Sequence, residues 1–322
     1  MRLGEMLRFA GLSGRVADAK VLATGMLNTV YSVTLGDTGR RVVIRERQFQ
    51  HPEYGQEFAA ERFAYPLIED ADVLVPELIY VRNSADPFGA PFAIFEHIEG
   101  PTLDVLLDDP QTPQSQRAAL LEGLAQSLAS IHRTRGPGYG TLTSIQLGSD
   151  QRREFFQGLF AREDERLARR APHLAPHYRA AVARWLDRLD QLPRYLGEPR
   201  LVHGDVHGRN VIVGSRNRLF FIDWEASRFR IAPYDLGQLC HINFRHQRAS
   251  VDQLLRLYAG ACGMESHMSA LASAVEICRV FWLCRMALFQ MQFPEHQDAY
   301  FGCAEDHLRE VESATNRCLA MD

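Results

Sequence analysis

Lysine is almost absent from this 322-residue sequence: Lys20 is the only lysine among 36 basic residues, and all the others are arginine. A Walker A phosphate-binding loop needs a lysine directly after a glycine-rich turn, and Lys20 has no such surroundings. The sequence therefore excludes a P-loop nucleotide site. It also leaves Lys20 as the single candidate for any mechanism that needs a side-chain amine.

Paired cysteines and long apolar runs are absent as well. None of the six cysteines belongs to a CxxC pair, and all six lie between positions 240 and 318, so we expect reduced thiols rather than a zinc site. The most apolar stretch, Ala274–Phe293, is interrupted by Glu276, Arg279 and Arg285, and charged residues also interrupt the first 15 residues. These patterns predict neither a membrane span nor a signal peptide, and we expect a cytoplasmic protein.

Neither sign of charge dominates. The 36 basic and 40 acidic residues give a formal net charge of −4 and a pI near 6.3. This balance argues against the basic face of a nucleic-acid binder and against a polybasic membrane anchor. With 46% hydrophobic and 24% charged residues, the composition is that of a globular protein. The length predicts two domains or one unit of two lobes.

The pattern of apolar residues changes near Gly100. Before it, β-branched runs predict strands at 21–24, 29–35, 41–45, 77–81 and 92–97, with a hairpin turn at 36–39 and one helix at about 52–68. After it, amphipathic segments predict helices at 116–134, 154–170, 177–192, 251–262 and 266–292. One strand-like interruption, 200–223, lies among these helices. The pattern predicts a small β-rich lobe followed by a larger helical lobe.

Polar side chains are concentrated in that interruption. Asp205 and Asn210 lie between two short apolar runs, and Asp223 ends a third run at 219–222. A strand–loop–strand hairpin would bring the three side chains together. Two carboxylates and an amide oxygen suit Mg²⁺ and leave one carboxylate to act as a base. For Asp205 or Asn210 taken alone, an ordinary turn residue is the simpler interpretation.

The pattern as a whole resembles a known family. The segment HGDVHGRN (203–210) is similar to the HGDxxxxN catalytic loop of the aminoglycoside phosphotransferase and choline kinase group, and FFIDWEAS (220–227) resembles its metal-binding segment. The resemblance implies an α+β, bilobal protein-kinase-like fold, with a small β-rich N-terminal lobe and a larger, mostly helical C-terminal lobe. It implies a nucleotide-binding lobe at 1–98, a catalytic and substrate-binding lobe at 99–322, and a hinge near 96–100.

The resemblance also assigns roles by motif position. Asp205 is the expected catalytic base, which accepts the proton of the substrate hydroxyl, and Asn210 and Asp223 are the expected ligands of Mg²⁺. Asp235 matches a residue that braces the catalytic loop, and His203 is expected to orient that loop by hydrogen bonding.

Three other polar residues of the C-terminal lobe have weaker assignments. His207, two positions after the base, either contacts the transferred phosphate or the substrate, or is a plain loop histidine. The case for a role of Arg209 is weaker still. His132, at the end of a predicted helix, is expected to be a buried hydrogen-bonding residue.

The expected nucleotide site draws on the first hundred residues. Asn28 lies in a segment, 24–33, that resembles the family's phosphate-covering loop, although Gly25 is the only glycine there. Arg45, in the third expected strand, matches the basic residue that binds the α- and β-phosphates, and Glu61 is its expected partner. Glu57, one turn earlier, is the second candidate for that partner.

The donor nucleotide, ATP or GTP, is expected to meet the hinge through its base. The segment 95–100 resembles the part of the family that receives adenine. The backbone carbonyl of Glu96 and the backbone amide of Ile98 are the expected contacts.

The acceptor is expected to be a small molecule with a hydroxyl group. Eleven residues separate Asp223 from Asp235, and no APE-like segment follows, so the activation segment with which a protein kinase presents a peptide is missing. A site for polycationic aminoglycosides should be rimmed with carboxylates, whereas the segments 228–230 and 241–248 are basic or neutral.

Two further groups of residues bear on the acceptor. Phe281, Trp282 and their apolar neighbours up to Met291 suit a bulkier or less cationic ligand wherever they reach the site. Glu305, Asp306 and Glu310 are instead candidates for an acidic rim.

Three functions stay open at this point. The foremost is an ATP- or GTP-dependent O-phosphotransferase that modifies an antibiotic of aminoglycoside, macrolide, nucleoside or peptide type, for resistance or self-protection. The alternative is a metabolic kinase acting on choline, homoserine or a sugar. A nucleotide-binding pseudokinase scaffold is the remote alternative, disfavoured by the intact set of Asp205, Asn210 and Asp223. We expect no nucleic-acid or membrane partner, and the oligomeric state is left open.

Overall fold

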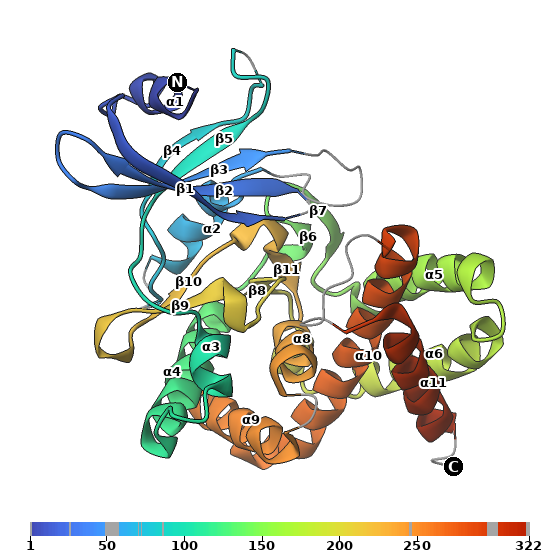
Figure 1. Cartoon of the computed structure of the whole chain (residues 1–322). Coiled ribbons are helices and arrows are strands. Elements are labelled where there is room, and N and C mark those ends of the chain that lie inside the picture. The colour runs from blue at the N-terminus through green and yellow to red at the C-terminus, as the bar shows by residue number, and fades with distance from the viewer. Residues whose placement is uncertain are drawn as a thin grey trace.

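The computed structural model describes residues 2–25, 27–48, 58–69, 71, 73–85, 87–244, 247–294 and 302–319. A small N-terminal lobe is built around an antiparallel sheet, and a larger, mostly helical C-terminal lobe lies below it in Figure 1. This is the α+β bilobal architecture that the sequence predicted.

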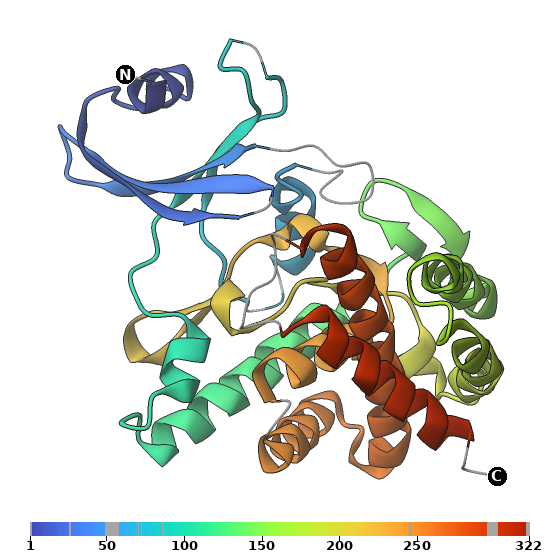
Figure 2. The same cartoon turned by 45° about the vertical axis from the view of Figure 1, so that its right-hand side comes forward.

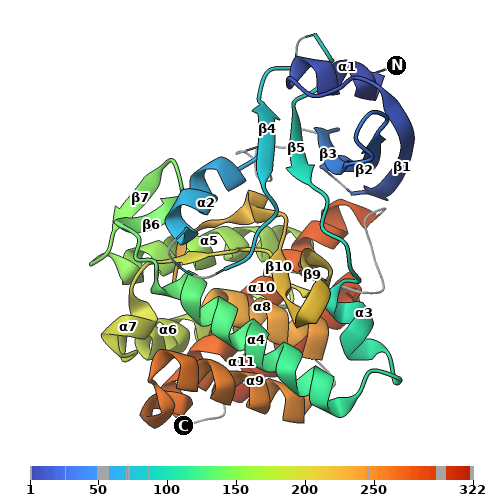
Figure 3. The ribbon, with the colours of Figure 1, turned by 90° about the vertical axis from the view of Figure 1, so that its left-hand side faces the viewer.

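The N-terminal lobe contains one five-stranded antiparallel sheet of order β1-β2-β3-β5-β4. Its strands are β1 (Val16–Thr24), β2 (Asn28–Leu35), β3 (Arg41–Arg47), β4 (Leu78–Arg82) and β5 (Phe92–Glu96). Helix α1 (Arg2–Phe9) buries Met6 and Leu7 against the sheet, and α2 (Glu61–Ile68) lies between the sheet and the C-terminal lobe (Figure 3).

Strand β3 has two chemically different faces. Successive side chains of a strand point to opposite sides of the sheet. Val42 and Ile44 therefore join the core under α1, whereas Arg45 and Arg47 project to the other face, where the ring of Phe58 lies 5.4 and 5.1 Å from their guanidinium carbons. The alternation within one short strand thus directs two arginines toward the C-terminal lobe.

The C-terminal lobe is a set of helices around the apolar helix α10. Its helices are α3 (Leu103–Asp108), α4 (Gln114–Arg133), α5 (Arg152–Arg170), α6 (Ala175–Asp190), α7 (Arg194–Gly197), α8 (Pro233–Phe244), α9 (Arg248–Cys262), α10 (Met268–Gln292) and α11 (Ala304–Leu319). Helices α10 and α11 run side by side in Figures 1 and 2, and α8 also packs on α10. Leu236 and Phe281 are among the buried side chains at these contacts.

Two small sheets carry the polar loops of this lobe. One is the hairpin of β9 (Val211–Val213) and β10 (Leu219–Phe221), in which Val211 pairs with Phe221. The other has the order β7-β6-β11-β8, with β6 (Gly138–Thr141), β7 (Ile145–Gly148), β8 (Arg200–Val202) and β11 (Arg228–Arg230). The predicted strand–loop–strand arrangement at 200–223 is therefore present, and β11 continues it.

The structure corrects the helix expected at about 52–68. Residues 49–57 lie outside the described part of the chain, and 58–60 form a turn in which Ala59 has a φ of +52°. A residue with this φ cannot belong to a right-handed helix, so α2 begins only at Glu61.

The apolar pattern also failed to predict several elements. No element was predicted at the positions of α1, α3, α8, α11, β6 or β7. In α8 every residue except Asn243 is buried, so no polar face exists to create a helical period.

Two further expectations, on membrane-spanning helices and on the cysteines, are compared with the described residues. No helix in the described ranges is long and apolar enough to cross a membrane. The five cysteines whose side chains are described carry free thiols.

Candidate active site

The loop 203–210 connects β8 to β9 and is held in place from below by helix α8. Asp235 accepts hydrogen bonds from the backbone N–H groups of His203 (2.7 Å) and Gly204 (2.9 Å). Gly204 has a φ of +82°, and a Cβ atom there would lie 2.2 Å from the carbonyl oxygen of Ala226. Glycine is therefore required where the loop passes the segment after Asp223.

Two buried histidines complete the support of this loop. His203 contacts the carbonyl oxygen of Ile222 through Nε2 (2.9 Å), and burial lowers the pKa of its imidazole. His132 contacts Asp235 (3.2 Å) and the hydroxyl of Tyr258 (2.9 Å). Both therefore make the buried hydrogen bonds expected of them.

Asp205 is held by two amide side chains and remains partly open to solvent. Gln238 donates to its Oδ1 (2.7 Å), and Asn210 donates to its Oδ2 (3.2 Å) and to its backbone carbonyl (2.9 Å). The side chain is 42% exposed. Burial raises the pKa of Asp205, but the charge and hydrogen bond of His207 outweigh this effect and hold the pKa at about 2. The group is therefore a carboxylate at neutral pH.

Asp223 lies at the end of β10, across the hairpin from Asn210. It has left-handed backbone angles (φ 61°, ψ 62°), which turn its side chain out of the strand direction. Its Oδ1 accepts a hydrogen bond from Arg45 (3.1 Å), so it meets a residue of the other lobe. Burial raises the pKa of the Asp223 carboxyl above its ordinary value, and the negative charges of Glu61 and Asp205 act in the same direction. The positive charge of Arg45 only partly offsets these effects. The backbone N–H of Ile222 donates to the carbonyl of Asn210 (3.0 Å) and fixes the two strands relative to each other.

The oxygen atoms of Asn210 and Asp223 fit a magnesium ion. The Asn210 amide nitrogen donates to Asp205, which leaves the amide oxygen as a ligand, and the Asp223 carboxylate is 41% exposed. Within the described residues no group of three or more His, Cys, Asp or Glu side chains could hold a metal ion. A set of two protein oxygens suits Mg²⁺, which usually takes its remaining ligands from water and phosphate groups.

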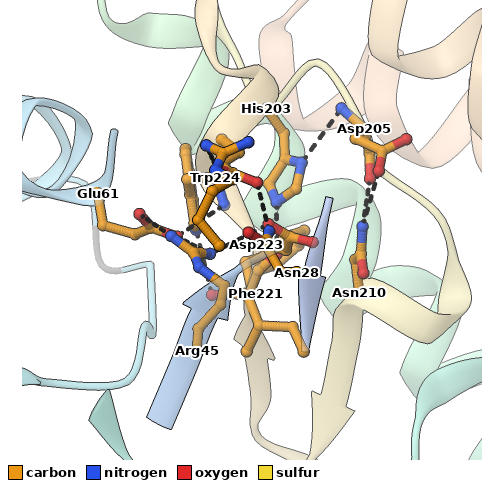
Figure 4. Close-up of polar contacts among 12 residues, drawn as sticks. Asn28, Arg45, Glu61, His203, Asp205, Asn210, Phe221, Asp223 and Trp224 are labelled. Atoms are coloured by element: carbon orange, nitrogen blue, oxygen red, sulfur yellow. Dashed lines mark hydrogen bonds and ion pairs between the residues drawn. The ribbon is translucent and has the colours of Figure 1, made fainter. Parts of the chain in front are cut away.

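Arg45 and Glu61 form a buried ion pair beside this hairpin, as the resemblance implied. The two nitrogens of the guanidinium group contact the two carboxylate oxygens at 2.7 and 2.9 Å, and the residues are 5% and 0% exposed. Burial raises the pKa of Glu61, but Arg45 lowers it below its ordinary value. The backbone N–H of Trp224 also donates to Glu61 (3.2 Å). Glu57, the second candidate, lies outside the described residues. Figure 4 shows the ion pair, Asp223 and Asp205 together.

Sequence reasoning missed three residues of the site. Arg47, on the same face of β3 as Arg45, forms an ion pair with Glu225. Glu225 also accepts a hydrogen bond from the Asn28 side chain (2.7 Å), so the expected phosphate loop contacts the C-terminal lobe. The two-residue spacing of the arginines on a strand was a usable signal for Arg47. Gln238, which holds Asp205, follows Asp235 by three residues on α8 and had no comparable signal.

Other expected site residues lie around this centre. His207 is buried, with Nε2 at 3.7 Å from Oδ2 of Asp205, whereas Arg209 lies 3.6 Å from Asp104 and is half exposed. Glu96 is the last residue of β5, and Ile98 lies in the segment that leads into the C-terminal lobe. The structure therefore places both backbone groups at the junction of the lobes, and their contact with a nucleotide base stays a prediction.

Several residues considered for the acceptor site are buried in the core or form ion pairs within the chain. Phe281 and Trp282 are buried in the core. Of the candidate acidic rim, Glu310 pairs with Arg279 (2.6 Å) and Asp306 with Arg309. These two carboxylates therefore already have cationic partners within the chain.

Comparisons with known proteins bear on this geometry. A sequence model described as the phosphotransferase enzyme family matches residues 18–272, more than three quarters of the chain. A thermostable mutant of the aminoglycoside phosphotransferase APH(4)-Ia is 19% identical with a TM-score of 0.61, and the alignment covers 99% of this chain and 98% of that one. A further variant of that mutant, in a ternary complex with ADP and hygromycin B, is 20% identical with a TM-score of 0.57, and the alignment covers 99% of this chain and 96% of that one. The gentamicin complex of APH(2")-IIa is 14% identical with a TM-score of 0.62, covering 95% and 92%.

These solved structures share the bilobal fold with the chain at identities of 20% or less. The family match extends from β1 through the loop of Asp205, the hairpin of Asp223 and helices α8 and α9. The resemblance inferred from two short motifs is thus confirmed over most of the sequence. The chain belongs to the phosphotransferase enzyme family, and it is a small-molecule kinase.

Proposed function

We propose that the protein transfers the γ-phosphate of ATP or GTP, with Mg²⁺, to a hydroxyl group of a small molecule. The observation that carries this proposal is the joint placement of an ionised Asp205, the Asn210 and Asp223 oxygens, and Arg45 with its buried partner Glu61. The ADP and hygromycin B bound by the APH(4)-Ia mutant support a nucleotide donor and a small acceptor.

The reaction forms a bond between the acceptor oxygen and the γ-phosphorus and breaks the bond from that phosphorus to the bridging oxygen, so that the nucleoside diphosphate leaves. Asp205 orients the acceptor hydroxyl and accepts its proton. A carboxylate with a pKa of about 2 is a weak base, which suits a loose transition state in which the proton leaves late. Asn210 and Asp223 would hold Mg²⁺, which would supply positive charge to the phosphate oxygens when bound.

The donor nucleotide is proposed to lie between the lobes. Arg45 binds the α- and β-phosphates, and Glu61 keeps its guanidinium group in place. Asn28 exchanges its present partner Glu225 for a phosphate oxygen. The carbonyl of Glu96 and the amide of Ile98 receive the base, with a hinge near 96–100 between a nucleotide lobe (1–98) and a catalytic lobe (99–322).

For the acceptor, we propose an antibiotic, modified for resistance or self-protection. The hygromycin B and gentamicin complexes of the structural neighbours support this class. A metabolic kinase is the second candidate, because arginines rather than carboxylates lie on β11, directly after the Asp223 segment.

The test is nucleotide-dependent release of ADP across an acceptor panel, with the Asp205→Ala protein as the blank. The panel contains aminoglycosides, macrolides, nucleoside and peptide antibiotics, choline, homoserine and simple sugars. Turnover of one antibiotic class supports the proposal, and turnover of a metabolite alone selects the metabolic kinase. If the protein binds Mg·ATP but modifies nothing in a panel that also includes anionic acceptors, it is a scaffold and the proposal fails.

A further inference from the structure

Arg230, on β11, is a buried cation without an acidic partner. It is 5% exposed, and its Nε and Nη1 atoms have no hydrogen-bond partner. No described carboxylate forms an ion pair with it, and burial lowers the pKa of its guanidinium group to about 9. Buried charges in proteins are normally paired, because an uncompensated one is costly. The positive charge of Arg230 is therefore not balanced by any described carboxylate, and a bound anion would stabilise it.

Aromatic rings surround this guanidinium group but do not neutralise it. The Tyr234 ring centre lies 4.4 Å from the guanidinium carbon, and those of Phe155 and Phe281 lie at 6.0 Å. Cation–π contacts of this kind stabilise a cation by less than the cost of burying an unpaired charge. The rings also exclude water, and so they strengthen any electrostatic contact formed there.

Two less buried arginines lie beside Arg230. Arg285 of α10 donates to the Tyr234 hydroxyl (3.0 Å) and is 27% exposed, with Nε at 3.8 Å from Glu163. Arg228 precedes Arg230 by two residues, so it lies on the same face of β11. We refer to Arg228, Arg230 and Arg285 as the arginine cluster. Both neighbours lower the pKa of Arg230 further, which shows that the three charges repel one another.

The arginine cluster adjoins the loop of Asp205. Arg228 donates to the carbonyl oxygen of Ala226 (2.7 Å), the atom that packs against Gly204, the residue before Asp205. On α8, Tyr234 precedes Gln238 by four residues, so the two lie on one face about 6 Å apart. Gln238 contacts Asp205, whereas Tyr234 contacts the arginine cluster. One helical turn of α8 therefore separates the residue that holds the proposed base from the residue that contacts the cations.

We propose that the arginine cluster binds an oxyanion of the acceptor, a carboxylate or a phosphate ester, while the acceptor hydroxyl faces Asp205. This inference rests on the proposed kinase function and names the chemical class of its acceptor. Arg228 and Arg285 meet the oxyanion from the solvent side, and Arg230 supplies uncompensated charge beneath them. Guanidinium groups recognise such oxyanions through paired, charge-assisted hydrogen bonds. A polycationic acceptor such as an aminoglycoside would be repelled at the same place, so this inference favours the other acceptor classes of the proposed panel.

The experiment measures oxyanion binding without turnover. Inorganic phosphate and glycerate are titrated calorimetrically into the full-length protein saturated with Mg·AMP-PNP, so that the nucleotide site cannot take the probe. We expect one binding site in the wild type and at least tenfold weaker binding in Arg285→Met, whose partly exposed side chain should be dispensable for folding. Arg230→Met should show the same loss. Arg256→Met, which changes an exposed arginine of α9, should bind as the wild type does.

The outcomes separate this inference from the kinase function. If neither probe binds the nucleotide-saturated wild type, or if Arg285→Met binds them equally well, the inference is overturned. Turnover of a cationic aminoglycoside that is unimpaired in Arg285→Met overturns it too, while the kinase function stands. A failure to bind Mg·AMP-PNP counts against the proposed function instead. Once an acceptor is identified, Arg285→Met should raise the KM for that acceptor and leave the KM for ATP unchanged.

Discussion

Replacing Glu61 by glutamine should reveal how much the buried ion pair with Arg45 stabilises the protein. The two residues are 0% and 5% exposed and make contacts of 2.7 and 2.9 Å. Removing one partner of a buried pair costs about 3–5 kcal/mol. Because Asp223, 3.1 Å from Arg45, still offers that guanidinium group a carboxylate, the cost should be about 3 kcal/mol. For 322 residues the entropy of unfolding is about 0.7 kcal/mol/K, so Tm should fall by about 4 °C.

Glu77→Gln is a matched control for this experiment. Glu77 also pairs with an arginine of the N-terminal lobe, Arg40 in the turn before β3, at 3.2 Å, but its side chain is 64% exposed. Surface pairs contribute about 0–1 kcal/mol, which corresponds to at most about 1.5 °C. Both variants are compared with the wild type by scanning calorimetry. Equal decreases in Tm would refute the reasoning. The double variant Glu61→Leu/Arg45→Met should regain stability but not the KM for ATP.

Three further predictions concern the catalytic loop. Asp205→Ala should lower kcat by about 10²–10⁴ and leave nucleotide affinity intact, and a kcat near that of the wild type would remove the base assignment. Because the pKa of Asp205 is held at about 2, its carboxylate should stay ionised, and its stabilising contribution should be lost only below about pH 4. This group should therefore give kcat/KM no acid limb between about pH 5 and 9, and a pH–rate profile with such a limb from Asp205 would contradict the assignment. Gly204→Ala, with a Cβ 2.2 Å from the Ala226 carbonyl, should lower Tm and kcat together, and a fully active, equally stable variant would show that the close approach is not required.

The sequence predicted the centre of the site well, because its determinants are local. Asp205 and Asn210 lie in one loop, and Asp223 lies across a short hairpin, so a strand–loop–strand pattern was enough to bring them together. Arg45 and Glu61 come from separate elements, yet the resemblance to the family identified both by their positions along the chain. Both groups of residues could therefore be assigned from sequence motifs, without knowledge of the tertiary packing.

The parts that could not be predicted depend on tertiary packing. Helix α8 is buried on nearly every side, so its residues carry no helical period, and Gln238 could not be assigned to Asp205. The partner of Glu225 is Arg47 on the other lobe, and no local pattern specifies a contact across 178 residues. The isolation of Arg230 is likewise a property of its surroundings rather than of its own segment.

The scarcity of lysine has a practical consequence for labelling. Lys20 is the only side-chain amine and lies exposed on the edge strand β1, whereas the phosphate-binding position proposed for Arg45 holds a guanidinium group that stays protonated. Nucleotide analogues that acylate an amine in the site would find no target there. An activated ester dye would instead attach to one defined side chain of the sheet, close enough to His97 to influence its charge. Such a dye would label the N-terminal sheet at an exposed position, and none of the residues proposed to bind the nucleotide or the magnesium ion carries a side-chain amine that it could modify.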